Sequence, residues 1–210
     1  MIARLATRKE CREEAFFCFL SWVFLLRSRS EASTLVMNAS EDTLRNRHQQ
    51  LVVPGVIGIL DQKLVIRLRS RKNRLGGDTI ARDCARKKKT GVNIHVPVCL
   101  CPIHFLWEWI KSRGVPGKPL FSEGVAGRSQ AWLQVALEAR GYPESSSYTL
   151  HALRRGGAQS IMDEGGDLAT ILKAGGWKSS AFRVYLDMMG LENAVVTASL
   201  GALLDMDAEA

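Results

Sequence analysis

A long apolar stretch lies near the start of the chain, at residues 15–26 (AFFCFLSWVFLL). Apolar side chains follow one another there without the polar face of a surface helix. This pattern predicts a helix over Glu10–Leu26 that is buried inside a domain. A membrane span needs about 20 apolar residues, and the flanking EEA and RSRSE segments differ from those of a signal peptide. A buried core helix is therefore the favoured interpretation.

The segments that follow predict strands. Residues 36–50 are polar and indicate a linker or an exposed helix. Two β-branched, partly alternating segments then predict strands at Leu51–Asp61 and Lys63–Arg69. After a basic turn, Thr79–Cys84 has the pattern of a returning strand. Together these segments predict an antiparallel hairpin with Lys72 near its tip.

The second half of the chain alternates helix signals with glycine turns. A further strand is predicted at Val92–Val98. Helices are predicted after Pro102, at Gln130–Arg140, from His151 to the Gly165–Gly166 turn, at Asp167–Ala174 and around Tyr185. A Ser or Thr within Gly141–Thr149 is suited to cap the helix that begins at His151. The elements as a whole predict an α+β fold, mainly helical, with a small antiparallel sheet on one edge.

Composition narrows the class of protein. The chain has 210 residues, of which 46% are hydrophobic, so wholesale disorder is not expected. Its 29 Lys and Arg exceed its 21 Asp and Glu, which gives a net charge of +8. Such a balance suits a domain that binds a polyanion, because phosphate contacts supply most non-specific affinity for nucleic acid. The alternative is a soluble protein that is merely basic.

Cysteine usage points to a reducing compartment. Five cysteines are an odd number, so a complete disulfide framework is not implied. Cys84, Cys99, Cys101 and His104 invite a zinc interpretation, but they lack the paired C-x2-C spacing of structural zinc sites. Buried thiols at a strand–helix junction are the favoured interpretation, and no metal site is predicted.

Candidate chemistry is concentrated in residues 151–185. His151 and Arg154 are three positions apart, so on a helix they share one face. An imidazole beside a guanidinium suits the holding and protonation of a phosphate oxygen. Two glycine turns later comes Trp177, followed eight positions on by Tyr185, whose phenol has the chemistry to attack that phosphate.

These residues resemble the catalytic core of the tyrosine recombinases, the phage-integrase family. The family pattern is H-x-L-R, then a G-[HW] step, then a Tyr a short distance on. The chain has H-A-L-R from His151, G-G-W ending at Trp177, and then Tyr185. Order, spacing and turn glycines agree together over about 35 residues, and the resemblance extends more loosely over roughly residues 10–200.

The family also has an upstream Arg before a Ser-Glu pair, and a Lys in a β-hairpin turn. The usual R-x-S-E spacing falls on Ser28, which leaves Arg27 and Arg29 as candidates. Arg27 is preferred, because a spacing one residue longer keeps it at the end of the apolar helix. A half-buried Arg there needs an anionic partner. The preferred hairpin lysine is Lys72, and its rivals are Lys63 and Lys87–Lys89.

The resemblance implies DNA strand cleavage and rejoining through a covalent 3′-phosphotyrosyl intermediate. Tyr185 would attack the phosphodiester and release a 5′-hydroxyl, while Arg27 and Arg154 clamp the non-bridging oxygens. Lys72 would protonate the leaving oxygen. This chemistry requires no metal and no other cofactor.

Two further roles follow from the same resemblance. His151 would act as a general base or a hydrogen-bond donor. Trp177 stands where many relatives have His, and its indole N–H can donate a hydrogen bond but cannot carry a proton.

The resemblance implies that the protein binds double-stranded DNA and other copies of the chain assembled on it. It also implies an intracellular location with DNA, in the nucleus of a eukaryote or in the cytoplasm and nucleoid of a bacterium. Basic residues are expected to contact the phosphate backbone. These are Arg71, Arg74, Lys87, Lys88, Arg155 and Lys178.

Three segments are expected: a flexible end at 1–9, a catalytic domain at 10–190, and a tail at 191–210 that docks on its own domain or on a neighbouring copy. Relatives usually carry an N-terminal domain that closes a clamp on DNA, and here the pattern starts almost at Met1. Weak, non-specific DNA binding is therefore expected.

Three alternative functions remain open from the sequence. The first is relaxation of DNA by a type IB topoisomerase-like enzyme. The second is a DNA-binding remnant of a mobile-element integrase that no longer cleaves. The third is a zinc-binding module built on the segment Cys84–His104.

Overall fold

The computed structural model of the protein describes residues 12–37, 40–46, 48–61, 63–71, 77–83, 102–113 and 115–177. The described residues form an α+β fold in which helices predominate. In chain order the elements are α2 (Arg12–Phe24), the π-helical turn η2 (Ser28–Ala32), β1 (Leu35–Met37), α3 (Glu41–Arg45), β2 (Gly55–Leu60), β3 (Lys63–Leu68), β4 (Asp78–Arg82), α5 (Pro102–Arg113), α6 (Val125–Glu138), the 3-10 turn η3 (Ser145–Ser147), α7 (His151–Asp163) and α8 (Leu168–Gly175).

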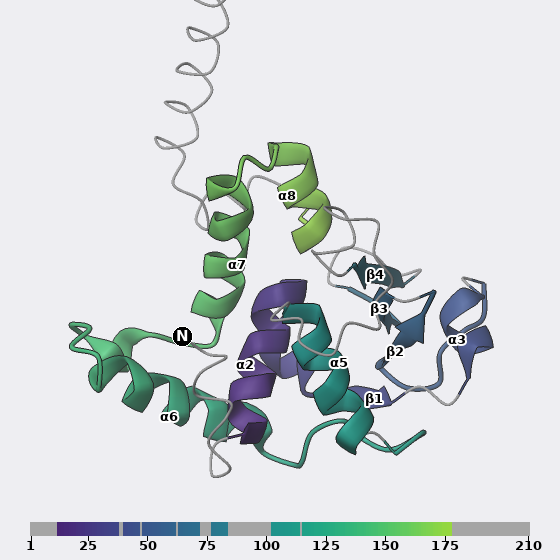
Figure 1. Ribbon diagram of the computed structural model, residues 1–210, viewed down its shortest axis with the longest axis horizontal. Helices are drawn as coiled ribbons and strands as arrows, with labels where there is room; N and C mark the ends of the chain where they lie inside the picture. The colour runs from purple at the N-terminus through teal and green to yellow at the C-terminus, as the bar shows by residue number, and fades with distance from the viewer. Residues whose placement is uncertain are drawn as a thin grey trace, which may run out of the picture.

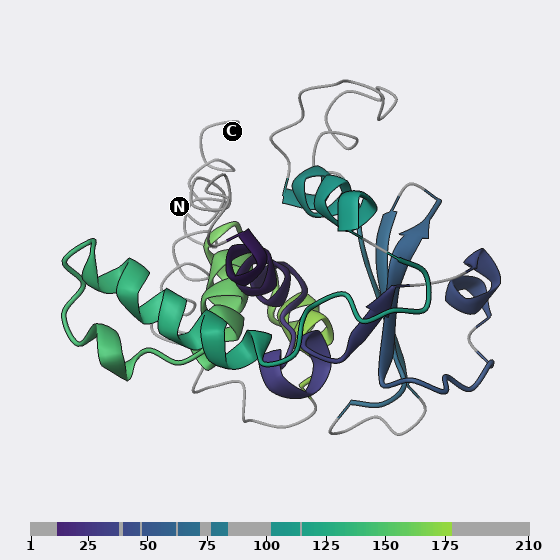
Figure 2. The same ribbon diagram turned by 90° about the horizontal axis from the view of Figure 1, so that it is seen from below.

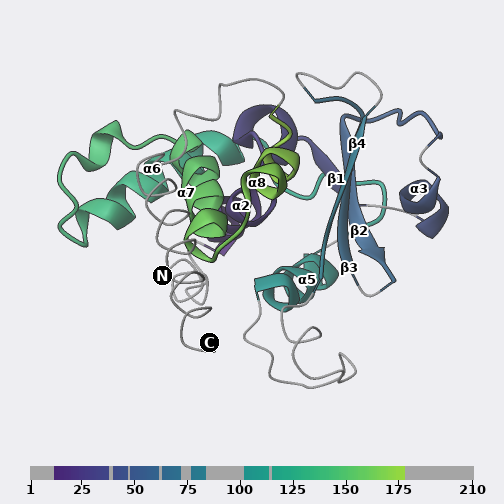
Figure 3. The ribbon, with the colours of Figure 1, turned by 90° about the horizontal axis from the view of Figure 1, so that it is seen from above.

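The sheet separates two layers of helix. Within the described residues it has four strands in the order β1-β2-β3-β4, and Figure 3 shows it edge-on, with α3 on one side and α2, α5 and α8 on the other. Residues alternate between its two faces, as the pleat of a strand requires. Ile57 and Ile66 join the main core, whereas Val56 and Val65 pack with Leu44 of α3 in a smaller cluster.

The prediction of a purely antiparallel sheet is wrong in one respect. The β2–β3 and β3–β4 pairs are antiparallel as expected, but β1 adds a parallel strand, with Leu35 opposite Gly55 and Met37 opposite Ile57. The sheet is therefore mixed. A strand of three residues shows too little alternation to be recognised from sequence.

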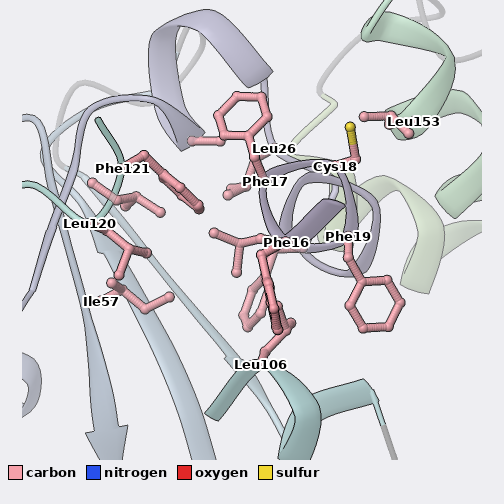
Figure 4. Close-up of a cluster of buried hydrophobic side chains, with 14 of the residues drawn as sticks. Phe16, Phe17, Cys18, Phe19, Leu26, Ile57, Leu106, Leu120, Phe121 and Leu153 are labelled. Carbon is pink, nitrogen blue, oxygen red and sulfur yellow. The ribbon is translucent and has the colours of Figure 1, made fainter. Parts of the chain in front are cut away.

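Helix α2 lies in the middle of the molecule, as the apolar run predicts (Figure 1). Every residue from Ala15 to Leu20 is buried. Phe16 stacks against Phe105 and Trp109, with ring centroids 4.6 and 4.5 Å apart, and Figure 4 shows it within the main apolar cluster. No helix within the described ranges is both long and apolar enough to cross a membrane.

Helix α7 crosses α2 at a glycine. A Cβ at Gly157 would lie 2.5 Å from the carbonyl oxygen of Trp22 and 2.5 Å from Leu25 Cδ2, so only glycine allows this approach. Helix α8 packs on the same side, where Ile171 joins Leu25 and Ala158 in a second buried cluster. Helix α6 extends away from the sheet, at the opposite end of the molecule from α3 (Figure 2).

Helix boundaries correct two expectations. Helix α6 begins at Val125, five positions before the predicted start at Gln130. No Ser or Thr side chain caps α7, because Leu150 occupies the N-cap position. The side chain of Gln130 accepts the Leu150 N–H instead, at 2.8 Å. The short helix after Gly166 is confirmed, and Asp167 caps it by accepting the N–H of Thr170.

The predicted strand at Val92–Val98 and the helix around Tyr185 lie outside the described residues, as do the predicted end at 1–9 and the tail at 191–210.

Candidate functional site

A buried carboxylate stands at the centre of the candidate site. Glu31 lies in the turn η2, where Ala32 N–H bonds the carbonyl of Arg27 and Ser33 N–H bonds that of Ser28, each five residues back. Such a turn is wider than an α-helical one by about one residue. It therefore accommodates the extra residue of the R-x-x-S-E spacing and returns Glu31 to the side of Arg27.

Arg27, rather than Arg29, faces this carboxylate. Its guanidinium Nη1 donates to Glu31 Oε1 at 2.6 Å, and its side chain is 25% exposed. Arg29 is an exposed residue of the same turn, and its carbonyl accepts the hydroxyl of Ser33. The anionic partner expected for a half-buried Arg27 is thus Glu31.

Arg71 reaches the same carboxylate from the sheet. Its side chain is 1% exposed, and its Nε and Nη2 donate to the two oxygens of Glu31 at 3.3 and 3.4 Å. Nη1 donates to Asp78 at 3.0 Å, and Nη2 also faces the carbonyl of Leu25. Arg71 was predicted to contact DNA; in the structure its guanidinium is buried and its donors are directed at groups of the protein.

Arg154 approaches Glu31 from α7. Its side chain is 2% exposed, and its Nη1 lies 4.0 Å from Glu31 Oε2. Nη2 donates to the carbonyl of Gly175 at the end of α8. The guanidinium carbon lies 4.7 Å from the ring centroid of Trp177, a cation–π geometry that desolvation strengthens.

Trp177 contacts Arg154 through the face of its ring and not through its indole N–H. From the sequence, we expected the indole N–H to donate a hydrogen bond. In the structure its ring face covers the guanidinium of Arg154. The glycine before it, Gly176, has a φ of +64°, the left-handed conformation that lets the chain turn back toward this guanidinium.

Among the described residues, the basic groups of the site outnumber the acidic ones. Three guanidinium groups, from Arg27, Arg71 and Arg154, surround the carboxylates of Glu31 and Asp78. Burial raises the pKa of Glu31, but the charge of Arg71 and hydrogen bonds from Arg27 and Arg71 outweigh it and leave that pKa below its ordinary value. The carboxylate is thus ionised at neutral pH, and the cluster keeps a positive surplus that favours an anion.

His151 lies at the start of α7, one turn before Arg154, and is exposed. Its pKa is lowered from 6.5, first by partial burial and then by the positive charges of Arg154 and Arg27. Both arginines of the cluster thus act on the charge of His151. A neutral imidazole can accept a proton, which is the state that a general base needs.

Some of the other predicted site residues lie within the part of the chain that the structure describes, and others lie outside it. Arg155 is exposed on α7, where it is available to an external anion. Lys63, a rival to Lys72, begins β3 at the end away from Arg71, and its ammonium pairs with Asp83 at 3.5 Å. The following lie outside the described residues: Lys72, Arg74, Lys87–Lys89, Lys178 and Tyr185.

Most residues of the zinc alternative lie outside the described part of the chain. Cys84, Cys99 and Cys101 lie outside the described residues, and His104 stacks beside Trp107 on α5 with ring centroids 6.2 Å apart. Among the residues that are described, no group of three or more His, Cys, Asp or Glu side chains could hold a metal ion.

Sequence reasoning missed the residues that hold the arginines in place. The Ser-Glu pair and the need of Arg27 for an anion were both signals for Glu31. Nothing in the sequence marks Asp78 as a partner of Arg71, because that contact depends on how the β3–β4 connection folds.

The arrangement is suited to hold a phosphate group. Arg27 is partly exposed, the buried Arg154 faces the same carboxylate, and the charges of both act on the exposed imidazole of His151. Guanidinium groups match the geometry of phosphate oxygens and stabilise negative charge that develops on them. Comparison of the chain with known protein families, with curated proteins and with solved structures finds no match.

Proposed function

We propose that this protein cleaves and rejoins DNA strands through a covalent 3′-phosphotyrosyl intermediate, in the recombination or integration of a mobile element. One observation supports the proposal most strongly. Arg27 and Arg154, which the chain separates by more than 100 positions, both face Glu31; Trp177 covers Arg154, and the charges of both arginines act on His151.

The chemistry assigns each group a step. The phenolic oxygen of Tyr185 forms a bond to phosphorus, and the bond from phosphorus to the 5′-oxygen breaks. His151, held neutral, receives the phenolic proton, while Lys72 gives a proton to the leaving oxygen. Arg27 and Arg154 stabilise the charge on the non-bridging oxygens. Rejoining reverses these steps, so no external energy source is needed.

Double-stranded DNA is the proposed substrate, and copies of the same chain are the proposed partners on it. The surplus of basic residues supports the first part, since phosphate contacts dominate affinity for DNA. Exposed Arg155, next to Arg154 on α7, is a proposed backbone contact.

A suicide substrate with a nick close to the cleavage site tests the proposal. Cleavage releases a short fragment that carries the 5′-hydroxyl, so the strand cannot be rejoined and the covalent adduct accumulates. We expect a covalent protein–DNA band with the natural chain and none with Tyr185→Phe. Tyr142→Phe, at an exposed tyrosine beyond α6, is the matched control and should retain the band. An adduct that persists in Tyr185→Phe would contradict the nucleophile assignment.

Two other outcomes separate the alternatives. DNA binding without any adduct from the natural chain would indicate a remnant that no longer cleaves. Relaxation of supercoiled plasmid with no joining of strands between two molecules would indicate a topoisomerase-like activity.

A further inference from the structure

Arg71 is a cation of the candidate site that an external ligand cannot reach. Its side chain is 1% exposed, whereas that of Arg27 is 25% exposed. A Cβ at Gly176 would approach Arg71 Nη1 to 2.8 Å, so the turn after α8 lies directly against the guanidinium. The charge of Arg71 can therefore act on a bound anion only through the groups around it.

Arg71 shares the carboxylate of Glu31 with Arg27. Each oxygen of Glu31 accepts from both arginines: Oε1 from Arg27 Nη1 and Arg71 Nε, and Oε2 from the Arg27 N–H and Arg71 Nη2. Burial raises the pKa of Glu31, and among the groups that lower it the charge of Arg71 contributes most and that of Arg27 least. The negative charge of Glu31 is thus balanced mainly by the buried arginine and less by the partly exposed one.

This balance determines how much positive charge remains for a ligand. Arg154 also faces Glu31, with its Nη1 4.0 Å from Oε2. Among the described groups, the guanidinium groups of Arg27, Arg71 and Arg154 exceed the carboxylates of Glu31 and Asp78 by one charge. Without Arg71 the remaining guanidinium groups would only equal the carboxylates, and the surplus that attracts an anion would be lost.

We infer that Arg71 is a positioning residue of the phosphate site and acts through its charge. It balances Glu31 from within the protein, so that Arg27 and Arg154 keep their charge for the phosphate group. The inference rests on the phosphate-binding part of the proposed function and does not require strand cleavage. The alternative is that Arg71 only ties η2 to β4 and has no effect on the ligand.

Titration of the full chain with inorganic phosphate tests the inference. The imidazole signals of His151 report on the site in NMR spectra at neutral pH and constant ionic strength, because the charges of Arg154 and Arg27 act on this side chain. We expect Arg71→Met to weaken phosphate binding by about tenfold. This is the order of magnitude for one charge acting across about 10 Å at an effective dielectric constant near 20.

Arg67→Met is the matched control. Arg67 is a buried arginine of β3, and its guanidinium donates to the carbonyls of Thr43 and Gln49 in the segment around α3. Its loss should lower the urea midpoint, as the loss of Arg71 should, but should leave phosphate affinity unchanged. Equal weakening of phosphate binding by both variants would assign the effect to loss of structure and overturn the inference.

Two changes of acidic residues give the test a sign. Adding Glu31→Gln to Arg71→Met removes the negative charge that has lost its partner, so phosphate affinity should return toward that of the natural chain. Asp78→Asn leaves Arg71 in place with one carboxylate fewer, so phosphate should bind more tightly than it does to the natural chain. If Arg71 only tied η2 to β4, neither change would improve phosphate binding.

Several results would overturn the inference. Unchanged phosphate affinity in a folded Arg71→Met chain would show that its charge does not reach the ligand. If that variant does not fold, weaker or unchanged phosphate binding by Asp78→Asn has the same meaning, as has a natural chain in which phosphate leaves His151 unaffected. The suicide substrate tests the proposed function separately. A natural chain that binds phosphate here but forms no adduct would contradict strand cleavage and leave the role of Arg71 intact.

Discussion

The backbone N–H and the guanidinium of Arg27 donate to the two oxygens of one carboxylate, that of Glu31, at 2.9 and 2.6 Å. One residue is thus held at both its main chain and its side chain by a partner four positions later. The wide turn η2 makes this possible, because its hydrogen bonds span five residues.

Removal of the carboxylate of Glu31 should destabilise the protein strongly. In Glu31→Ala the buried guanidinium of Arg71 keeps only Asp78 as a charged partner among its described contacts. Breaking a buried ion pair on one side costs about 3–5 kcal/mol, measurable as a lower urea midpoint. Glu41→Ala removes one of the two carboxylates that pair with the exposed Arg45 and should change the urea midpoint very little. Equal effects of the two would contradict the central role of Glu31.

The same carboxylate should make stability fall in acid. Because the folded pKa of Glu31 lies below the ordinary 4.5, the unfolded chain binds the proton more readily. The stabilisation is fully present above pH 4.5 and is lost as the pH falls through the folded pKa. The urea midpoint of the natural chain should therefore decline below pH 4.5 more steeply than that of Glu31→Gln.

His151 should titrate below its ordinary pKa of 6.5, and the shift should depend on Arg27. Partial burial and the charges of Arg154 and Arg27 all disfavour the imidazolium. Arg27→Gln removes one positive charge and should move the pKa of His151 upward, as followed by NMR. Arg29→Gln, in the exposed part of the same turn, should leave it unchanged.

The lowered pKa of His151 also sets the sign of a stability effect. Between the folded pKa and 6.5 the unfolded chain binds more protons, so this residue contributes stability that rises with pH across that window and is lost as the pH falls through it. A pKa of His151 above 6.5 would contradict its placement beside the arginines.

Two neighbouring glycines of α7 should respond in opposite ways to alanine. At Gly157 a Cβ would meet the carbonyl oxygen of Trp22 at 2.5 Å, so Gly157→Ala must move α7 away from α2 and should cost about 1–3 kcal/mol. At Gly156 the nearest atom, Trp22 Nε1, is 3.7 Å away, and alanine favours a helix by roughly 0.5–1 kcal/mol. Urea unfolding of the two variants measures both effects. Destabilisation by Gly156→Ala would contradict the space that the structure leaves for a Cβ at Gly156.

The start of α7 should depend on Gln130 of α6. Its carbonyl oxygen accepts the Leu150 N–H at 2.8 Å, and its amide donates to Tyr148. Gln130→Ala should cost about 1 kcal/mol, as the loss of a helix cap does. Gln134→Ala removes only donations to exposed carbonyls and should cost less. Amide exchange at the first turn of α7 would show whether fraying begins there.

Much of the fold can be predicted, because its main signals are local. The uninterrupted apolar run identifies α2, the period-two alternation identifies β2 and β3, and the glycines after α7 mark its end. The strand β1 is too short for such a pattern. The start of α7 at His151 is as predicted, but the capping group was mispredicted because the acceptor of the Leu150 N–H, Gln130, belongs to another helix.

The candidate site likewise has a part that the sequence could predict and a part that it could not. Motif spacing predicted Arg27, His151, Arg154 and Trp177 as site residues, since a helix places residues three apart on one face and a glycine turn reverses the chain. The charge network could not be predicted. Whether Arg71 is exposed or buried depends on a contact across 40 positions to Glu31, which no local pattern encodes.

The central position of α2 has a consequence for synthesis on the ribosome. This helix leaves the exit tunnel before its partners in α6 and α7, which follow more than 100 positions later, as the contact between Cys18 and the carbonyl of Ser129 shows. At bacterial or eukaryotic elongation rates that delay is roughly ten seconds. During this interval a segment as apolar as a targeting signal stays uncovered, so the nascent chain should be a strong client of chaperones that bind exposed hydrophobic segments.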